Sequence, residues 1–449
     1  MKILKTAIFL FVSWVLIQGA PAQELRDERM SPSGPFTLEQ CIKTSLENNP
    51  ALKAQEWEAK AARDRANQAR GKRWPSVNAV GGYKHTLDSQ ALIPSRHNGE
   101  KRTFGDSFFS ADLVLTLPLF TGGRLVNEIK AAELLQKAAE HELGRTRESL
   151  VFDVSSLFFS ILSQRHVIES LKFSKKALQK HLKKVEQLIS ARKAALVDRL
   201  RTEVRIADLE QKLSRENNVL QIQRRALANT MGIKETQNPL RIQGKLEQER
   251  AQVPPLHESL LNALSKRVDY VAAKEALEAQ ARKVSAARAG YWPTVSLGGS
   301  YGRRWAYNPT ESPSGADDSE DVGQVATLLN IPLFQGGQIR ARVHEESAKL
   351  NAARERLRNL ELRVRLEVRT ALLNITSARD RIKATEKAVA QARESLRIEQ
   401  EKYQLGKGSI VDVLDAQSAL LNSQTTYYRS LADYRTAWAQ FRLAVGEEK

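Results

Sequence analysis

The sequence predicts an α+β membrane protein built by internal duplication, in which each half supplies long coiled-coil helices and one β-hairpin. Three observations predict this fold class. The chain repeats its motifs at a long period, its helical stretches keep a 3.5-residue apolar repeat, and two segments of each half alternate in polarity as membrane strands do.

The duplication is visible in two pairs of motifs. Residues 73–77 (Arg-Trp-Pro-Ser-Val) are echoed by residues 291–295 at an offset of 218, and residues 117–123 by residues 331–337 at an offset of 214. Asp198 and Gly232 recur as Asp412 and Gly446, again at 214. Such a long period indicates a duplicated module and not a short-repeat solenoid.

The N-terminus has the three regions of a secretory signal peptide. Lys2 and Lys5 precede an apolar run from Ala7 to Ile17, and Ala20-Pro21-Ala22 supplies an A-x-A cleavage site, so we expect cleavage near Ala22. The expected organisation is a signal peptide (1–22), an N-terminal tail (23–35), a first repeat (36–252, with a hairpin over 74–120), a second repeat (253–446, with a hairpin over 292–334) and a C-terminal tail (447–449).

Composition limits the classes of function. No apolar run approaches the roughly 20 residues that a membrane-spanning helix needs. The net charge of +18 becomes +16 without Lys2 and Lys5, and the basic residues alternate with Glu along helices, which is typical of a solvated helix face. Export from the cytoplasm, which the signal peptide predicts, also argues against nucleic acid as a partner. The single cysteine, Cys41, allows no intrachain disulfide, and we expect it to be a small buried residue.

The helical stretches are unusually long. No proline occurs between Phe120 and Asn238, or after Pro332. Apolar residues recur at alternating spacings of four and three from Leu150 to Ile189, interrupted only by Gln164 and Lys175, which predicts coiled-coil packing. A continuous helix from Arg124 to about Ser190 would be about 100 Å long.

Two segments in each half alternate in polarity and predict strands of about ten to fourteen residues. In the first half, apolar residues at 77–83 and 109–117 alternate with polar ones; in the second half, Val295 to Tyr301 and Val325 to Leu333 do the same. Residues 88–105 and 306–321 are polar and would join the strands of each hairpin. The strand lengths and the aromatic residues near the strand ends match membrane-spanning strands.

Counting strands points to an oligomer. Four strands cannot close a barrel with a lumen, and open sheet edges cannot exist in lipid. Three copies would supply twelve strands, an even number that closes. We therefore expect each chain to be one third of a channel, in which the long helices continue the pore away from the membrane.

The junctions between helices and strands carry the residues that such transitions need. Proline ends the preceding helix at the Trp-Pro pairs, and glycine permits unusual dihedral angles where a strand turns into a helix. These junction residues are Trp74, Pro75, Pro118, Gly122 and Gly123 in the first half, and Trp292, Pro293, Pro332, Gly336 and Gly337 in the second.

One stretch resembles a known family. Residues 403–417 (Tyr-Gln-Leu-Gly-Lys-Gly-Ser-Ile-Val-Asp-Val-Leu-Asp-Ala-Gln), followed by Tyr427, Tyr434, Leu443 and Gly446, are similar to the aperture turn of the outer-membrane efflux proteins, the TolC-like trimeric channels. The similarity includes the duplication and both hairpins and runs from about Phe36 to Gly446.

The resemblance implies a homotrimer in the Gram-negative outer membrane, in contact with outer-membrane lipid. A twelve-stranded transmembrane β-barrel would continue into a periplasmic α-barrel that is closed at its far tip. Members of the family dock onto a periplasmic adaptor protein and an inner-membrane transporter, which is either proton-driven or an ABC pump. We expect no cofactor and no metal.

Five residues form the candidate gate. Asp412 and Asp415 resemble the family's aperture acids, and a spacing of three places both on one helical face, where a trimer would gather six carboxylates in a cation-favouring ring. Asp198 and Tyr403 match positions that help to hold the family's tip closed. A well-known member carries arginine at the position of Gly408; the adjacent Lys407 is the candidate substitute, although on a helix it would point roughly 100° away.

No enzymatic constellation emerges, since His257-Glu258 and His344-Glu345 lack a second histidine at the spacing of a zinc motif. The sequence therefore predicts an exit duct of a tripartite efflux system and not an enzyme. A type I protein-secretion conduit of the same architecture stays open as an alternative, and so, with less support, does a periplasmic coiled-coil scaffold.

Overall fold

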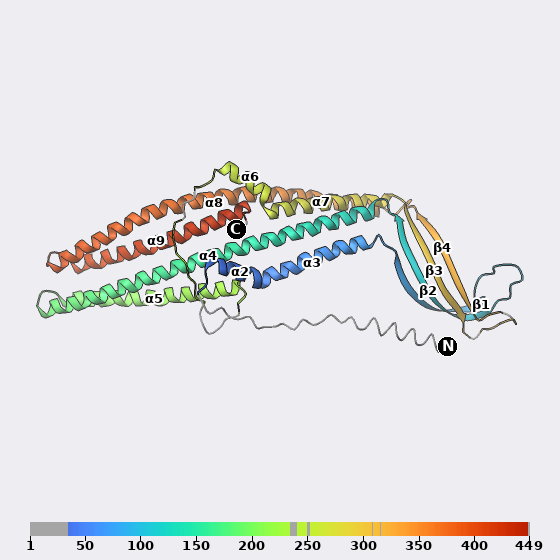
Figure 1. Ribbon diagram of the computed structural model, residues 1–449, viewed down its shortest axis with the longest axis horizontal. Coiled ribbons are helices and arrows are strands. Elements are labelled where there is room, and N and C mark those ends of the chain that lie inside the picture. Colours follow the sequence, from blue (N-terminus) through green and yellow to red (C-terminus); the bar gives the residue numbers. More distant parts are fainter. Residues whose placement is uncertain (1–34, 234–239, 249–251, 308, 315, 448–449) are drawn as a thin grey trace. The chain divides into compact units, whose positions relative to one another are not determined.

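Four long helices and one antiparallel sheet carry the fold (Figure 1). The computed structural model describes residues 35–233, 240–248, 252–307, 309–314 and 316–447, so the expected signal peptide lies outside the described residues. The elements from Phe36 onward belong to one unit. They are α2 (Leu38–Asn48), α3 (Pro50–Gly71), β1 (Ser76–Ala91), β2 (Phe104–Phe120), α4 (Arg124–Ser190), α5 (Leu196–Thr230), α6 (Leu256–Lys266), α7 (Val268–Arg288), β3 (Thr294–Ala306), β4 (Ser319–Asn330), α8 (Gln338–Gln404) and α9 (Ile410–Val445).

The two longest helices confirm the helical prediction. α4 and α8 have 67 residues each, and α4 begins and ends where the sequence predicted. Both polar interruptions of the apolar repeat in α4 meet glutamates of α5: the Gln164 side-chain amide donates to the Glu216 carboxylate at 2.6 Å, and Lys175 lies 2.8 Å from Glu210. These two polar pairs help to fix the register of the antiparallel α4–α5 coiled coil, in addition to its apolar contacts.

The sheet joins the two halves of the chain. Its strand order is β1-β2-β3-β4 and every pairing is antiparallel, so the two hairpins meet through β2 and β3. β1 and β4 are the edges. Large apolar side chains of the sheet are exposed in the single chain, among them Val77, Tyr83, Tyr301 and Val325.

Two strand predictions were wrong in detail. The first hairpin has strands of 16 and 17 residues, longer than the expected ten to fourteen, and these strands take in part of the expected 88–105 loop. β4 ends at Asn330, so Ile331 and Leu333 are not strand residues. Thr294 is the first paired residue of β3, and it is preceded by Pro293, which has no N–H. The segment after Asn330 therefore finds no ladder partner among the described residues.

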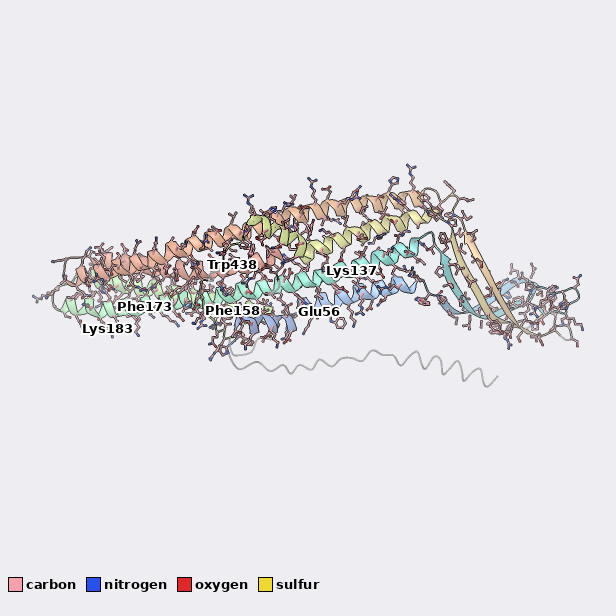
Figure 2. All side chains as sticks on the ribbon, turned by 45° about the horizontal axis from the view of Figure 1, so that its top comes forward. Glu56, Lys137, Phe158, Phe173, Lys183 and Trp438 are labelled. Carbon is pink, nitrogen blue, oxygen red and sulfur yellow. The ribbon has the colours of Figure 1, made fainter. Side chains whose placement is uncertain are left out.

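The apolar core lies between the helices and has two parts. One part unites α4, α8 and α9 with the shorter helices, as Phe158 and Trp438 mark in Figure 2; the other follows the coiled coils through Leu178, Val185 and Leu420 toward the helix turns. Cys41 is fully buried on α2, as predicted, and burial raises the pKa of its thiol to about 12.

One charged side chain lies inside the core. Arg267, 1 % exposed, stands between α6 and α7 and forms a bidentate pair with Asp269 at 2.7 and 3.0 Å. It also donates to Glu367 of α8 at 2.5 Å and to the carbonyl oxygen of Ala444 at 3.3 Å. This arginine therefore ties the end of α9 to three other helices.

Candidate functional site at the two helix turns

The turns that end α4 and α8 have the same backbone geometry. In the first, the amides of Ala191, Arg192 and Lys193 donate to the carbonyl oxygens of Gln187, Ile189 and Leu188. In the second, residues 405–407 repeat these three bonds at an offset of 214. The left-handed position is Gly406 (φ 70°) in the second turn but Arg192 (φ 56°) in the first.

Tyr403 and Asp198 are in contact. The Tyr403 hydroxyl donates to the Asp198 carboxylate at 3.4 Å, so this bond links the end of α8 to the first turn of α5. Tyr403 is 8 % exposed, and its ring centroid lies 5.3 Å from that of His181 on α4. Burial, with the nearby Asp198 charge and the hydrogen bond, raises the pKa of Tyr403 to about 12. The phenol is therefore a neutral donor at physiological pH.

Asp412 and Asp415 are exposed in the first turns of α9, and their spacing of three puts both on one face of this helix. Together with Glu399, Lys402 and Lys407 they line an open groove of about 630 Å³. Lys402 pairs with Glu399 at 2.7 Å, and no ion pair joins Lys407 to either aspartate among the described residues. Among the described residues, neither these two carboxylates nor the Lys407 ammonium group forms an ion pair.

Asp412 also has a local structural partner. Its carboxylate accepts from the Ser409 backbone amide at 3.4 Å while the Ser409 hydroxyl accepts from the Val411 amide at 3.1 Å, which is a capping box at the start of α9. Replacing Asp412 by alanine therefore removes both a charge and a helix cap, and asparagine is the more selective substitution.

Lys407 and Gly408 lie in the turn and not on a helix, so the expected 100° offset between them does not apply. A Cβ atom on Gly408 would meet the Lys402 Cβ at 2.9 Å and the Tyr403 backbone nitrogen at 3.1 Å. An arginine at this position would need the turn to shift. The turn as it stands therefore leaves no room for a side chain at position 408.

Glycines stand at both strand-to-helix junctions. Gly122, Gly123, Gly336 and Gly337 all have positive φ, and Gly123 and Gly337 are the N-caps of α4 and α8. Pro75 and Pro293 directly precede β1 and β3, next to the exposed Trp74 and Trp292. The two later prolines differ, because Pro118 lies within β2 opposite Ser296 whereas Pro332 follows the end of β4.

Sequence reasoning missed His181 and Arg192. His181 follows an ordinary polar pattern on α4, and only the fold brings it to Tyr403. Arg192 had a readable signal, since at the 214-residue offset it replaces Gly406 in a turn that requires a left-handed residue.

The described part of the chain holds neither a metal-binding cluster nor a membrane-spanning helix. No group of three or more His, Cys, Asp or Glu side chains is placed to hold a metal ion there. Within the same residues, no helix combines the length and the apolar character needed to cross a membrane.

Comparison with known proteins assigns the family. The family model for outer membrane efflux proteins matches residues 41–233 and 260–447. The outer membrane protein TolC of Escherichia coli strain K12 is 23 % identical over 412 residues, which cover 89 % of this chain and 80 % of TolC. The proteases secretion protein PrtF of Dickeya chrysanthemi is 22 % identical, covering 90 % of this chain and 86 % of PrtF.

Solved structures share the fold. The outer-membrane channel OprN matches with a TM-score of 0.77 at 19 % identity, covering 92 % of this chain and 90 % of OprN. VceC of Vibrio cholerae matches with a TM-score of 0.75 at 20 % identity, covering 91 % of this chain and 96 % of VceC. The chain therefore belongs to the outer membrane efflux protein family: it is a channel protein of the outer membrane that extends into the periplasm, and not an enzyme.

Proposed function

We propose that this chain forms the exit duct of a tripartite efflux system, as a homotrimer that works with a periplasmic adaptor and an inner-membrane pump. The observation that carries the proposal is the four-stranded sheet with two open edges, joined directly to helices of 67 residues. Open edges are excluded from lipid, so β1 of one copy must pair with β4 of another. Three copies give twelve strands and a closed barrel.

The helix turns would form the gate of this duct. Each chain supplies a groove with three carboxylates and two ammonium groups, a net charge of −1 that threefold symmetry multiplies around the axis. A ring of fixed negative charge in a narrow pore favours cations. The bond between Tyr403 and Asp198 holds α8 against α5, so its loss is expected to favour opening.

The duct is passive. A conduit need not bind what it conducts, and the pump supplies the energy and chooses the cargo. Efflux of small molecules is the first candidate, because similar proteins include the outer membrane efflux protein BepC of Brucella suis. Protein secretion is the second candidate, because the Pseudomonas aeruginosa alkaline protease secretion protein AprF is 25 % identical over 207 residues.

The experiment is reconstitution of the detergent-purified protein. Its mass in detergent should correspond to three chains, and planar bilayers should show discrete conductance steps. Extraction without detergent, or a well-folded oligomer without conductance, would favour a periplasmic scaffold instead. Deleting the gene should sensitise cells to small toxic compounds if the duct serves efflux. It should abolish a secreted protein if the duct serves secretion.

A further inference from the structure

The α4–α5 turn region carries positive charge that the chain does not neutralise. Residues 172–201 contain ten Lys and Arg against two acids, a net charge of +8, whereas the equivalent residues 386–415 contain five against six, a net charge of −1. Lys175 pairs with Glu210 and Arg199 with Glu203. The other eight are exposed and form no ion pair with a described acidic side chain: Lys172, Lys176, Lys180, Lys183, Lys184, Arg192, Lys193 and Arg201.

The opposite turn region pairs two of its five cations with its own acids and keeps a net charge of −1. Arg397 lies 2.6 Å from Glu394 and 2.5 Å from Glu401, and Lys402 pairs with Glu399. The position equivalent to Arg201 is Asp415, an acid. Two hairpins with the same fold therefore present different charge to a partner, and a generally basic composition does not account for the difference.

Four exposed lysines of α4 are regularly spaced along one side of the helix. Lys172, Lys176, Lys180 and Lys183, hereafter the cationic stripe, are spaced by four, four and three residues and fall within roughly 80° of the helix surface. Phe173 lies beside them and is 64 % exposed. Lys183 and Phe173 mark this stretch of α4 in Figure 2. An exposed aromatic side chain with polar groups at its rim is typical of a binding surface.

Arg192 continues the charge to the turn itself. It is the one residue other than glycine with positive φ among the described residues, in a turn whose repeat carries glycine. A side chain in this left-handed conformation raises the free energy of the folded state, which glycine would not do. Strained residues of this kind gather at functional positions.

We propose that the cationic stripe and Arg192 form the docking surface for an acidic helical segment of the protein that meets the channel at its helix turns. This rests on the proposed function, which supplies such a partner. Carboxylates on the partner helix, repeated every three or four residues, would match the spacing of the stripe. The α8–α9 turn region, with its net charge of −1, would not attract the same segment.

The length of the surface favours a helix alongside α4 over an anionic lipid surface at the turn. From Lys172 to Arg192 is 20 residues, which spans about 30 Å along the chain at a helical rise. Charges are screened within about 8 Å at physiological ionic strength. A flat membrane touched by the turn would therefore leave most of the stripe unused.

Binding of a designed helical peptide to the full-length, detergent-purified channel tests the proposal. The acidic probe carries glutamate at every third and fourth position, and its control carries glutamine instead. The acidic probe should bind, more weakly as salt rises, and the control should not. The K172Q/K176Q/K180Q/K183Q variant should weaken binding by roughly tenfold or more, because each exposed ion pair contributes modestly.

Two further variants separate charge from folding. Arg192→Gly relieves the strained backbone, so weaker binding by this variant cannot come from misfolding. R397Q/K402Q changes paired cations at the opposite turn and should bind as the native protein does. The proposal would be overturned if the R397Q/K402Q variant lost as much peptide binding as the stripe variant. It would also be overturned if the acidic probe and its glutamine control bound equally well. Binding to phosphatidylglycerol vesicles that the acidic peptide fails to displace would overturn it as well.

Bilayer recordings keep this proposal distinct from the proposed function. If the native protein does not conduct, the duct itself is refuted, whatever the peptides do. If it conducts and the stripe variant binds the acidic peptide normally, only the docking surface is refuted. A changed reversal potential in the stripe variant would place these lysines in the pore and would also refute docking.

Discussion

Tyr403→Phe isolates one bond of the proposed gate. The substitution keeps the ring that packs against His181 and removes only the hydroxyl that donates to Asp198 at 3.4 Å. Hydrogen bonds to charged groups contribute roughly 1.5–3 kcal/mol, and this one is long, so we take about 1 kcal/mol per chain. That corresponds to a factor of about five in the closed-to-open equilibrium of one chain. If three chains open together, the factor is on the order of a hundred.

Single-channel open probability in planar bilayers measures this effect, with uptake of a bulky antibiotic by intact cells as a second reading. Tyr403→Phe should open more often than the native channel, and Asp198→Asn should have a smaller effect in the same direction. Tyr403→Ala is the packing control, since it also empties a buried site. If Tyr403→Ala opens the channel and Tyr403→Phe does not, packing and not the hydrogen bond closes the gate.

Three further predictions concern the packing, the pH response and the junctions. Arg267→Met should lower the free energy of unfolding by roughly 1–3 kcal/mol, measured by denaturant titration, because it removes the buried partner of Asp269 and Glu367; the loss stays modest since Asp269 keeps Arg145 at 3.7 Å and Glu367 is partly exposed. Burial and the Lys184 charge lower the pKa of His181 below its usual 6.5, although Asp198 acts in the opposite direction. The folded arrangement around neutral His181 therefore keeps its stability above pH 6.5 and loses it as pH falls through the lowered pKa. Open probability should rise in acid, and H181F should lose this dependence. Gly122→Ala should reduce the yield of folded oligomer more than Gly336→Ala, because a Cβ at Gly122 would lie 2.5 Å from the Trp292 Cβ and one at Gly336 would meet nothing within 4 Å.

Each of these has an outcome that contradicts it. Unchanged stability of Arg267→Met would mean that the acids find other partners or water. An open probability that is flat between neutral and acidic pH, or equally steep in H181F, would remove His181 from the gate. Similar yields of the two glycine variants would show that the contact between Gly122 and Trp292 does not constrain the junction.

The sequence predicted the long elements better than their ends. The bounds of α4 followed from an apolar repeat without proline, because helix period and chain continuity are local properties. The end of β4 at Asn330 could not be read locally, since a strand ends where its ladder partner ends, and that partner is 36 residues earlier in the chain.

At the proposed gate, too, local features could be predicted and long-range contacts could not. The spacing of Asp412 and Asp415 placed them on one face, but the capping role of Asp412 depends on turn geometry. The pairing of Tyr403 with Asp198 joins residues 205 positions apart, so it was available only through the family resemblance. His181 came from neither source, because its place beside Tyr403 depends on how α4 packs against α8 and α9.

The central claim is that these chains form a conduit with an acidic constriction, and reversal potential in a salt gradient tests it most directly. The native oligomer should give small cation-selective conductance steps. Asp412→Asn with Asp415→Asn keeps side-chain size and the Ser409 hydrogen-bond acceptor while removing charge, and should shift the reversal potential toward zero; the matching alanine pair should do the same. An unchanged reversal potential in both pairs would contradict the acidic constriction, and a folded oligomer that never conducts would contradict the conduit itself.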